Sequence, residues 1–571
     1  MFSAKNVIFA YQNSRKMIKR VLCFLIITTF VAQICAQISY GGSPRIASES
    51  ILKDTPVPAV NLPVIDNQKY IAEDLLNSGK GHPMRLSVMQ DVSISNKTHG
   101  ITETLSNGDK VWRLKIISEG AEHTFPVFSK YDIPEGAELF VYTPNLDLVL
   151  GSFNIESTNK DGGFYTQSLP GDEFIIEYYE PAEVAGQGTL EISQVAHGYK
   201  SFLGFKNNKN DKVLDNSSGR CQINVACSEG NNWDNQKRSV LLMYMVYGGY
   251  GYMCSGALIN NARNNKTNYF LTAYHCIESF SSLTSVSFTF YFNAQTSSCT
   301  GTSGTSNQTV TGATKVAGNS KSASNGSDFL LLKLTSSIPS SYRPYYSGWY
   351  RGASASVGSC IHHPNGDWKK ISVPYSVQAI STSGWTNFWY VRWKTGSANK
   401  GCVEGGSSGS PLFNANKQII GQLQGGKSDC DYVNYSDYMY DMYGRFDKSW
   451  SGGGTTTTRL SYWLDPNNSG VASVPGLNYD GTVDIQNATA ANSTMSVYPN
   501  PSKGEFNIDI PDLGEAIYTV YDISGRQVVQ SRTVLSTNVH KINLSGLANG
   551  AYRLEMIVNE KKYIKPILIN K

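Results

Sequence analysis

The distribution of cysteine restricts the fold of this chain more than any other feature. Eight of its ten cysteines lie between Cys221 and Cys430, and the other two, Cys23 and Cys35, lie near the N-terminus. An even number of cysteines confined to one section of an exported chain predicts disulfides. A zinc site is the alternative reading, and it is disfavoured because no C-x-x-C pair is present. The number of cysteines alone does not determine which of them are joined.

The N-terminus predicts export. A basic lead that ends at Arg20 precedes the mostly apolar run 21–34, and Ala36 offers a small residue for cleavage. This pattern is typical of a secretory signal, and we assign it to residues 1–36. The apolar run is shorter than the roughly 20 residues that a membrane span needs. A lipid anchor at Cys35 is an alternative, disfavoured by its apolar neighbour.

A chain of 571 residues is expected to contain several domains. Composition shifts and polar linkers divide it into a signal peptide, a β-rich propeptide, a cysteine-containing domain, a linker and a C-terminal module. Their expected bounds are 1–36, 37–220, 221–476, 477–495 and 496–571.

Short strand-like runs separated by Gly, Ser and Asn loops predict an all-β protein. No long run with helical period competes with them in the middle section. This pattern is typical of a two-barrel or sandwich domain. The runs in the middle section are 240–247, 269–273, 286–292, 328–334, 389–393 and 418–423.

Three residues of this section form a candidate catalytic set. Ser408 lies in the glycine-rich segment 405–411, which suits a nucleophile on a tight turn with backbone amides free to bind an oxyanion. His275 ends an apolar run, and imidazole is a base near neutral pH. Asp328 heads an apolar strand and suits a carboxylate that orients the histidine. Each has a structural reading when taken alone: a linker, a packed histidine and a strand cap.

The three motifs together resemble those of the trypsin-like serine peptidases, and the match is closest to the bacterial lysyl endopeptidases. The order His, Asp, Ser is one of several known triad orders. The resemblance covers about 221–476 and implies a chymotrypsin-like double β-barrel, with the amides of Gly406 and Ser408 as oxyanion donors. It is carried by Cys254-Ser-Gly-Ala-Leu-Ile259, Leu271-Thr-Ala-Tyr-His-Cys276, Asp328-Phe-Leu-Leu-Leu332, Gly406-Ser-Ser-Gly-Ser-Pro411, His362-His-Pro364, Tyr443-Gly-Arg445 and Arg459-Leu-Ser-Tyr-Trp-Leu-Asp-Pro466.

The resemblance also implies disulfide pairs. They are Cys221 with Cys430, Cys227 with Cys299, and Cys254 with Cys276. Cys360 and Cys402 have no counterpart in that family, and by elimination we expect them to pair. Such a bond would brace the nucleophile loop, because Cys402 lies only six residues before Ser408.

Substrate choice is expected to depend on a buried carboxylate, which favours a basic side chain strongly. In the family an acidic residue precedes the Tyr-Gly-Arg turn, and Asp441 matches it here. The implied preference is cleavage after lysine, although arginine stays open. The nearby acids Asp429, Asp431 and Asp437 are rivals that we interpret as solvated loop residues.

Two positions depart from the family, which pairs a tryptophan with a histidine near the cleft. Trp385 is the candidate tryptophan, and the histidine position is Gln424. The doubled His362-His363 suggests a metal site, but the resemblance makes it structural. We expect no metal and no cofactor.

The residue before the nucleophile is Ser407 rather than an aspartate, so the activation switch of many animal enzymes is absent. We expect residues 37–220 to act as a folding or inhibitory propeptide. Candidate processing points are Lys209, Lys212 and Arg220 in the polar linker, and self-cleavage after Lys212 would suit the lysine preference.

Alternating strands and tight turns predict a small β-sandwich at 496–571. Its opening Ser496-Val-Tyr-Pro-Asn-Pro501 and the segment Leu547–Leu554 resemble the C-terminal sorting domain of type IX secretion cargo. The implied partner is the type IX secretion machinery. A carbohydrate-binding domain is the alternative, and it is disfavoured because no aromatic cluster is present.

A formal net charge of +4 with no long Lys/Arg run argues against nucleic acid and anionic membranes as partners. We expect a monomer that acts on proteins or peptides with lysine at the cleavage site. A non-catalytic surface adhesin on the same fold is the alternative function. An α/β-hydrolase esterase is disfavoured by the triad order and the lack of strand–helix alternation.

Overall fold

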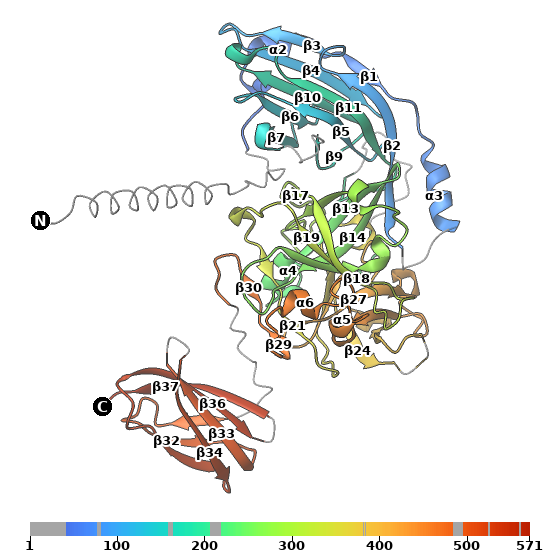
Figure 1. The fold of residues 1–571 in the computed structure, drawn as a ribbon. Coiled ribbons are helices and arrows are strands. Elements are labelled where there is room, and N and C mark those ends of the chain that lie inside the picture. Colours follow the sequence, from blue (N-terminus) through green and yellow to red (C-terminus); the bar gives the residue numbers. More distant parts are fainter. Residues whose placement is uncertain are drawn as a thin grey trace, which may run out of the picture.

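The structure is a computed structural model that describes residues 41–76, 82–157, 164–205, 218–380, 382, 384–483, 495–522, 526–558 and 561–571. The expected signal segment 1–36 and the processing candidates Lys209 and Lys212 lie outside the described residues. The described part is built mostly of strands, in three regions along the chain (Figure 1). The all-β prediction is therefore confirmed.

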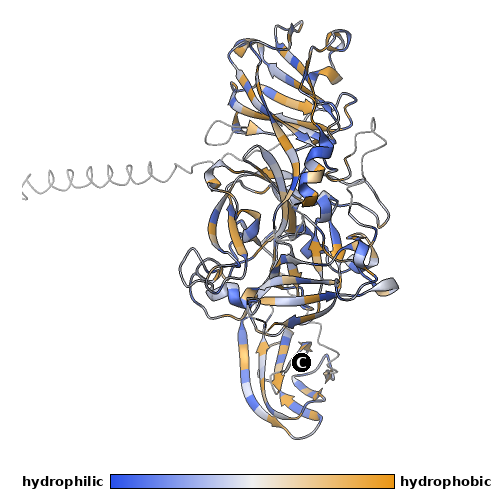
Figure 2. Cartoon of the chain, turned by 90° about the vertical axis from the view of Figure 1, so that its right-hand side faces the viewer, coloured by the Kyte–Doolittle hydropathy of each residue, from blue (hydrophilic) through white to orange (hydrophobic). Residues whose placement is uncertain are grey.

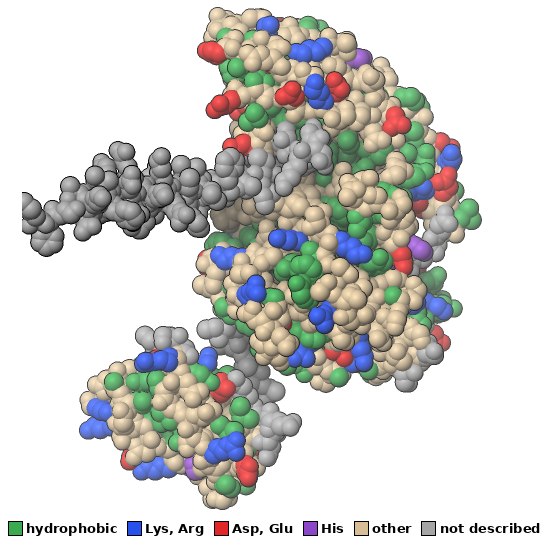
Figure 3. Space-filling model, in the orientation of Figure 1, with side chains coloured by type: hydrophobic (Ala, Val, Ile, Leu, Met, Phe, Trp, Pro, Cys, Tyr) green, Lys and Arg blue, Asp and Glu red, His purple; other side chains and the backbone are tan. Residues whose placement is uncertain are grey.

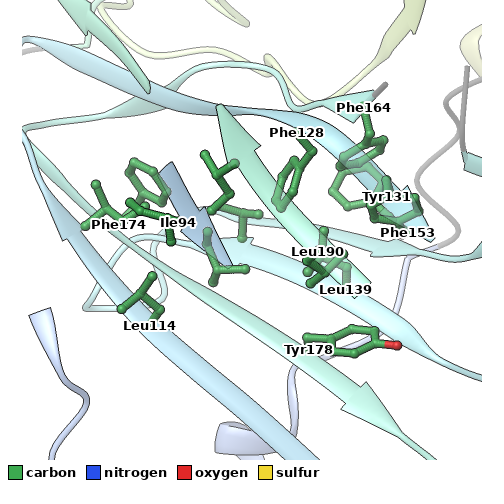
Figure 4. Packing of buried hydrophobic residues seen from close by; sticks show 14 of the residues in the cluster. Ile94, Leu114, Phe128, Tyr131, Leu139, Phe153, Phe164, Phe174, Tyr178 and Leu190 are labelled. Carbon is green, nitrogen blue, oxygen red and sulfur yellow. The ribbon is translucent and has the colours of Figure 1, made fainter. Parts of the chain in front are cut away.

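The N-terminal region is a β-sandwich. One sheet contains β1 (Ala59–Asn61), β3 (Ile101–Thr104), β4 (Lys110–Ile117), β6 (Glu138–Tyr142), β7 (Val149–Phe153) and β10 (Glu173–Glu180). The other contains β2 (Met84–Ser95), β5 (His123–Asp132), β8 (Phe164–Tyr165), β9 (Leu169–Pro170) and β11 (Thr189–Gly198). Apolar side chains from both sheets meet between them, among them Leu114, Phe128 and Phe174 (Figure 4). The helix α3 (Asn67–Leu76) lies beside this sandwich.

The middle region holds two β-barrels, as the resemblance implied. The first contains β13 (Val240–Tyr247), β14 (Tyr250–Leu258), β15 (Tyr269–Ala273), β16 (Ser287–Tyr291), β17 (Thr309–Thr311), β18 (Ala313–Asn319) and β19 (Phe329–Leu334). The second contains β12 (Ile223–Asn224), β21 (Trp349–Tyr350), β22 (Cys360–His362), β23 (Lys370–Ser372), β24 (Pro374–Ala379), β25 (Phe388–Trp393), β26 (Pro411–Phe413), β27 (Ile419–Gly426), β28 (Tyr440–Arg445) and β29 (Ser473–Val474). Short helices α4 (Asp234–Ser239), α5 (Phe446–Ser451) and α6 (Ser461–Leu464) flank them.

The strand β19 is buried on both faces, which explains its continuous apolar sequence. Leu330 and Leu332 enter the core of the first barrel, whereas Phe329 and Leu331 enter a core shared with the second barrel. Successive side chains of a strand point to opposite faces, so a strand buried on both sides reads as a continuous apolar run. This shared core packs the two barrels against each other, and it includes Phe329, the residue after Asp328.

One sheet crosses the expected boundary near residue 220. Its order β17-β16-β13-β14-β2-β11-β5-β8 joins the first barrel to the N-terminal sandwich through the pair β14–β2. The middle region also extends past its expected end, because β30 (Leu477–Asn478) pairs with β20 (Tyr345–Tyr346). Composition could not reveal either pairing, since both depend on contacts between distant segments.

The C-terminal module is the expected two-sheet sandwich. β31 (Ser496–Tyr498), β32 (Glu505–Asp509) and β35 (Val539–Asn543) form one sheet, and β33 (Gly514–Tyr521), β34 (Gln527–Leu535), β36 (Gly550–Val558) and β37 (Lys561–Ile569) form the other. Apolar and polar residues alternate along these strands (Figure 2). On the face in Figure 3, Lys and Arg are scattered rather than gathered into one patch.

Candidate active site

His275 and Asp328 are brought together by two paired strands. β15 runs antiparallel to β19, with Ala273 opposite Phe329. Consequently His275, two residues after Ala273, meets Asp328, the residue before Phe329. The backbone amide of Tyr274 donates to the Asp328 carbonyl, 2.9 Å away, and closes this corner.

Both carboxylate oxygens of Asp328 accept hydrogen bonds from His275. Oδ1 accepts the backbone N–H at 2.9 Å, and Oδ2 lies 2.6 Å from the imidazole Nδ1. The aspartate is 1% exposed and has a φ of 59°, a left-handed conformation that costs free energy for a residue with a Cβ. Two bonds to one partner set both the position and the tautomer of the ring, leaving the proton on Nδ1 and the lone pair on Nε2.

The other ring nitrogen of His275 is available for chemistry. Nε2 is buried and has no hydrogen-bond partner within the described ranges. No hydrogen bond joins it to Ser408 among these residues either. The segments that carry the two residues are nevertheless linked through β14, because the amide of Ser255 donates to the Ser408 carbonyl at 2.8 Å and the Ser255 carbonyl accepts from the Thr272 hydroxyl at 2.8 Å.

The loop that holds Ser408 requires two glycines. Gly406 and Gly409 both have φ of 80°, in the left-handed region that favours glycine. A Cβ at Gly409 would also lie 2.0 Å from Thr272 Oγ1. These glycines let the loop turn sharply against β14 and β15.

Some backbone amides of this loop donate hydrogen bonds within the protein and others do not, as an oxyanion hole requires. Those of Ser407, Gly409 and Ser410 donate to backbone carbonyls, at 3.2, 2.8 and 3.0 Å. In the part of the chain that the structure describes, the amides of Gly406 and Ser408 have no acceptor. Two free donors on a rigid turn can bind a developing oxyanion without reorganisation.

Asp441, on β28, is completely buried beside the segment that leads to Ser408. Its carboxylate accepts hydrogen bonds from the Trp393 indole at 2.7 Å and from the Ser428 hydroxyl. The Ser428 hydroxyl also lies 3.1 Å from the Val403 carbonyl oxygen. A Cβ at Gly426 would lie 2.4 Å from Asp441 Oδ1, so glycine there keeps the wall of this site open.

The structure places Trp385 in the turn between β24 and β25, partly exposed, and Gln424 half-buried on β27. The residue that lies on the Trp385 ring is Lys321, with Nζ 3.4 Å from the ring centroid. Burial lowers the pKa of Lys321, and the nearby carboxylate of Asp328 opposes this shift. Sequence reasoning missed Lys321, because an isolated lysine in a polar loop carries no signal.

The paired histidines brace the nucleophile loop. His362 Nδ1 lies 2.8 Å from the Ser407 hydroxyl, and its Nε2 lies 2.9 Å from the Ser372 hydroxyl. The pKa of His363 is held well below its usual range, first by burial and then by the charge of Lys369. These contacts fit the structural interpretation of the pair.

Three of the four expected disulfides are present. Cys221 is joined to Cys430, Cys227 to Cys299 and Cys254 to Cys276. The expected bond between Cys360 and Cys402 is wrong, because neither of these buried cysteines is joined in a disulfide. Cys360 Sγ faces the Ser410 hydroxyl at 3.4 Å, whereas Cys402 Sγ faces Cys221 Sγ at 3.5 Å. Pairing by elimination failed because two cysteines can both be buried in one core without facing each other.

Glu404 is a second residue that the sequence did not single out. It is buried four residues before Ser408, and its two carboxylate oxygens accept the Gly219 amide at 3.2 and 3.1 Å. This contact fixes the start of the middle region to the nucleophile loop. Arg220, the remaining processing candidate, is exposed beside it.

The double barrel has a chymotrypsin-like fold, and the Asp328–His275 pair and the glycine-flanked Ser408 loop lie in it as the candidate active site. Residues 215–444 match the family model of the lysyl endopeptidase C-terminal domain, and residues 496–570 match that of the secretion system C-terminal sorting domain. The second match marks the chain for export. No helix in the described ranges has the length and apolar character to cross a membrane.

The chain is similar to a lysyl endopeptidase of Pseudomonas aeruginosa, with 31% identity over 308 residues. The match covers 50% of this chain and spans only 62% of the length of that relative. Among solved structures, the protease Anisep from Arthrobacter nicotinovorans has 17% identity, covers 36% of this chain and 90% of its own, and gives a TM-score of 0.27. A Glu endopeptidase has 19% identity, covers 40% of this chain and 91% of its own, and also gives 0.27. Because these TM-scores are low, we base the double-barrel assignment on the strand pairings described above and not on these two structures.

Proposed function

We propose that this chain is an exported serine endopeptidase that cleaves peptide bonds on the carboxyl side of lysine. The observation that carries the proposal is the Asp328–His275 pair beside a serine loop with two free amides. The similarity to lysyl endopeptidases supports it independently. Catalysis needs no cofactor in this mechanism.

In the proposed mechanism, His275 Nε2 takes the Ser408 proton as Oγ attacks the scissile carbonyl. Asp328 holds the ring and stabilises its charged form. The amides of Gly406 and Ser408 bind the oxyanion, a contribution of roughly 3–4 kcal/mol per donor in comparable enzymes. The leaving amine takes the proton from Nε2, and water then releases the acyl group from Ser408 by the reverse path.

Lysine preference is assigned to Asp441. Its carboxylate is buried and is held by neutral donors, the Trp393 indole and the Ser428 hydroxyl. A cationic side chain entering from the nucleophile side would gain a charge-assisted interaction in a poorly solvated site. Arginine presents the same charge on a larger head, so a protease that accepts both residues is the alternative substrate range.

The experiment is cleavage of a mixed peptide library with mass spectrometry of the new ends. Wild type is compared with Ser408→Ala, Asp441→Asn and the matched control Asp437→Asn, which changes an exposed acid nearby. We expect cuts after lysine that vanish in Ser408→Ala, fall about 10²-fold or more in Asp441→Asn, and persist in the control. Unchanged lysine cleavage in Asp441→Asn would remove Asp441 from the pocket.

A serine-directed organophosphonate separates the enzyme from the adhesin alternative. The enzyme should be labelled on Ser408, and Asp441→Asn should still be labelled if its site is formed. A correctly matured chain that neither labels nor cleaves would favour the adhesin.

A further inference from the structure

A lysine from the first barrel lies on a tryptophan from the second barrel, beside the candidate active site. Lys321 belongs to the loop 320–327, which joins β18 to β19 and leads directly into Asp328. Its Nζ lies 3.4 Å from the centroid of the Trp385 ring, in the turn between β24 and β25. The contact therefore spans the two barrels close to the residue that orients His275.

The loop that carries this lysine is anchored to the second barrel. The Gly326 carbonyl accepts a hydrogen bond from the Asn387 side-chain amide at 3.0 Å. The Ser327 carbonyl accepts one from the Gln422 side-chain amide at 2.8 Å. Two bonds from the second barrel therefore hold the end of the loop that leads into Asp328, and they limit how far the lysine can move from the site.

The ammonium of Lys321 is half-buried and forms no ion pair among the residues that the structure describes. The nearby Asp328 uses both of its carboxylate oxygens on His275. Glu278, near the start of the loop, accepts a hydrogen bond from the Ser320 hydroxyl. The aromatic face attracts the ammonium without neutralising its charge. A carboxylate brought by a substrate would therefore gain a charge-assisted interaction here.

We propose that Lys321 is a specificity-determining residue that favours substrates with an acidic side chain directly before the scissile lysine. A substrate held at Ser408 passes the histidine–aspartate pair, so its neighbouring side chains come within reach of this ammonium. The position before the lysine is assigned from the polar linker of the chain itself, where Asp211 directly precedes the candidate processing site Lys212. This inference rests on the proposed function.

The test compares two peptides that differ only in the residue before one central lysine, which is aspartate in one peptide and asparagine in the other. Both are given to the matured wild type, to Lys321→Gln, to Lys321→Arg and to the matched control Lys333→Gln, which removes an exposed lysine of the same barrel. The readout is the ratio of kcat/KM for the aspartate peptide to that for the asparagine peptide. An organophosphonate counts the competent Ser408 in each preparation.

We expect wild type to prefer the aspartate peptide by roughly threefold or more, as one partly solvated charge pair allows. Lys321→Gln should bring the ratio close to one, whereas Lys321→Arg and Lys333→Gln should keep the preference. In wild type the preference should also fall as salt is raised to about 1 M, because ions screen a partly exposed pair. The salt series does not depend on any variant.

A smaller wild-type ratio would overturn the inference, and so would a preference that Lys321→Gln leaves unchanged. In either case, cleavage of both peptides after lysine would leave the proposed function standing. A matured chain that cleaves neither peptide would instead contradict the proposed function, and the inference with it.

Discussion

At the residue scale, the site depends on the two bonds between Asp328 and His275. The bond to the His275 backbone N–H sets the position of the ring, and the bond to Nδ1 selects its tautomer. The Asp328 carboxylate therefore fixes both the position and the tautomer of His275. An amide at this position keeps the size but can donate to the ring and reverse the tautomer.

Asp328→Asn is therefore expected to lower kcat about 10⁴-fold with little change in KM. Steady-state kinetics on a lysine-containing peptide would measure the change. Asp437→Asn serves as the matched control, because it removes an exposed carboxylate of the same region. A fall of less than tenfold would mean that another group orients His275.

The two cysteines outside the disulfides, Cys360 and Cys402, give a second prediction at this scale. Burial raises the pKa of Cys360 to about 12, so its thiol stays protonated and unreactive in the folded protein. Under denaturing, non-reducing conditions, an alkylating reagent should label Cys360 and Cys402 and spare the six disulfide-bonded cysteines. Peptide mapping would identify them, and reduction beforehand should label all eight. If neither cysteine is labelled before reduction, the two form a fourth disulfide after all.

At the element scale, the contact with β15 limits which residues can occupy the turn between Ser408 and β26. Gly409 combines a positive φ with a position so close to Thr272 that no side-chain carbon fits. Both conditions follow from packing one loop against two strands.

Gly409→Ala is expected to lower the free energy of unfolding by about 2–4 kcal/mol, from the strained φ and the steric overlap together. Gly396→Ala is the matched control, with φ of 59° and no atom within 4 Å of the added Cβ. The difference between the two variants in denaturant unfolding isolates the overlap. Equal losses would show that the loop moves away from β15 freely.

At the scale of the whole molecule, two regions of the chain share one sheet and one buried core. His123 lies in that core, and its ring packs against Phe202 and against Tyr244 of the first barrel. The pKa of His123 is lowered to about 3, mainly by burial, which the Lys200 backbone opposes and to which the charge of His197 adds a smaller share. The folded state therefore excludes the proton that the unfolded chain accepts.

Because the folded pKa is depressed, the unfolded chain binds more protons between about pH 6.5 and pH 3, and stability falls as the pH falls through this window. At pH 4.5 the loss from His123 alone is about 2–3 kcal/mol. His123→Leu should reduce this acid loss, whereas His99→Leu at the surface should leave it in place. Unfolding monitored at pH 7 and pH 4.5 checks both, and an equal acid loss in all three proteins would exclude His123 as its source.

The sequence by itself determined the all-β class and most of the strands, because these depend on local periodicity. Its short motifs singled out the candidate triad, which stays a prediction. The runs 240–247 and 269–273 match β13 and β15 to the residue. Only the tertiary structure decided the contacts between distant segments: Lys321 on Trp385, Glu404 on Gly219, the absence of a disulfide between Cys360 and Cys402, and the β2–β14 pairing. The physical reason is that hydrogen bonds and thiol contacts between distant segments form only when the groups lie within a few ångströms of each other in the right orientation. Neither composition nor spacing carries that information.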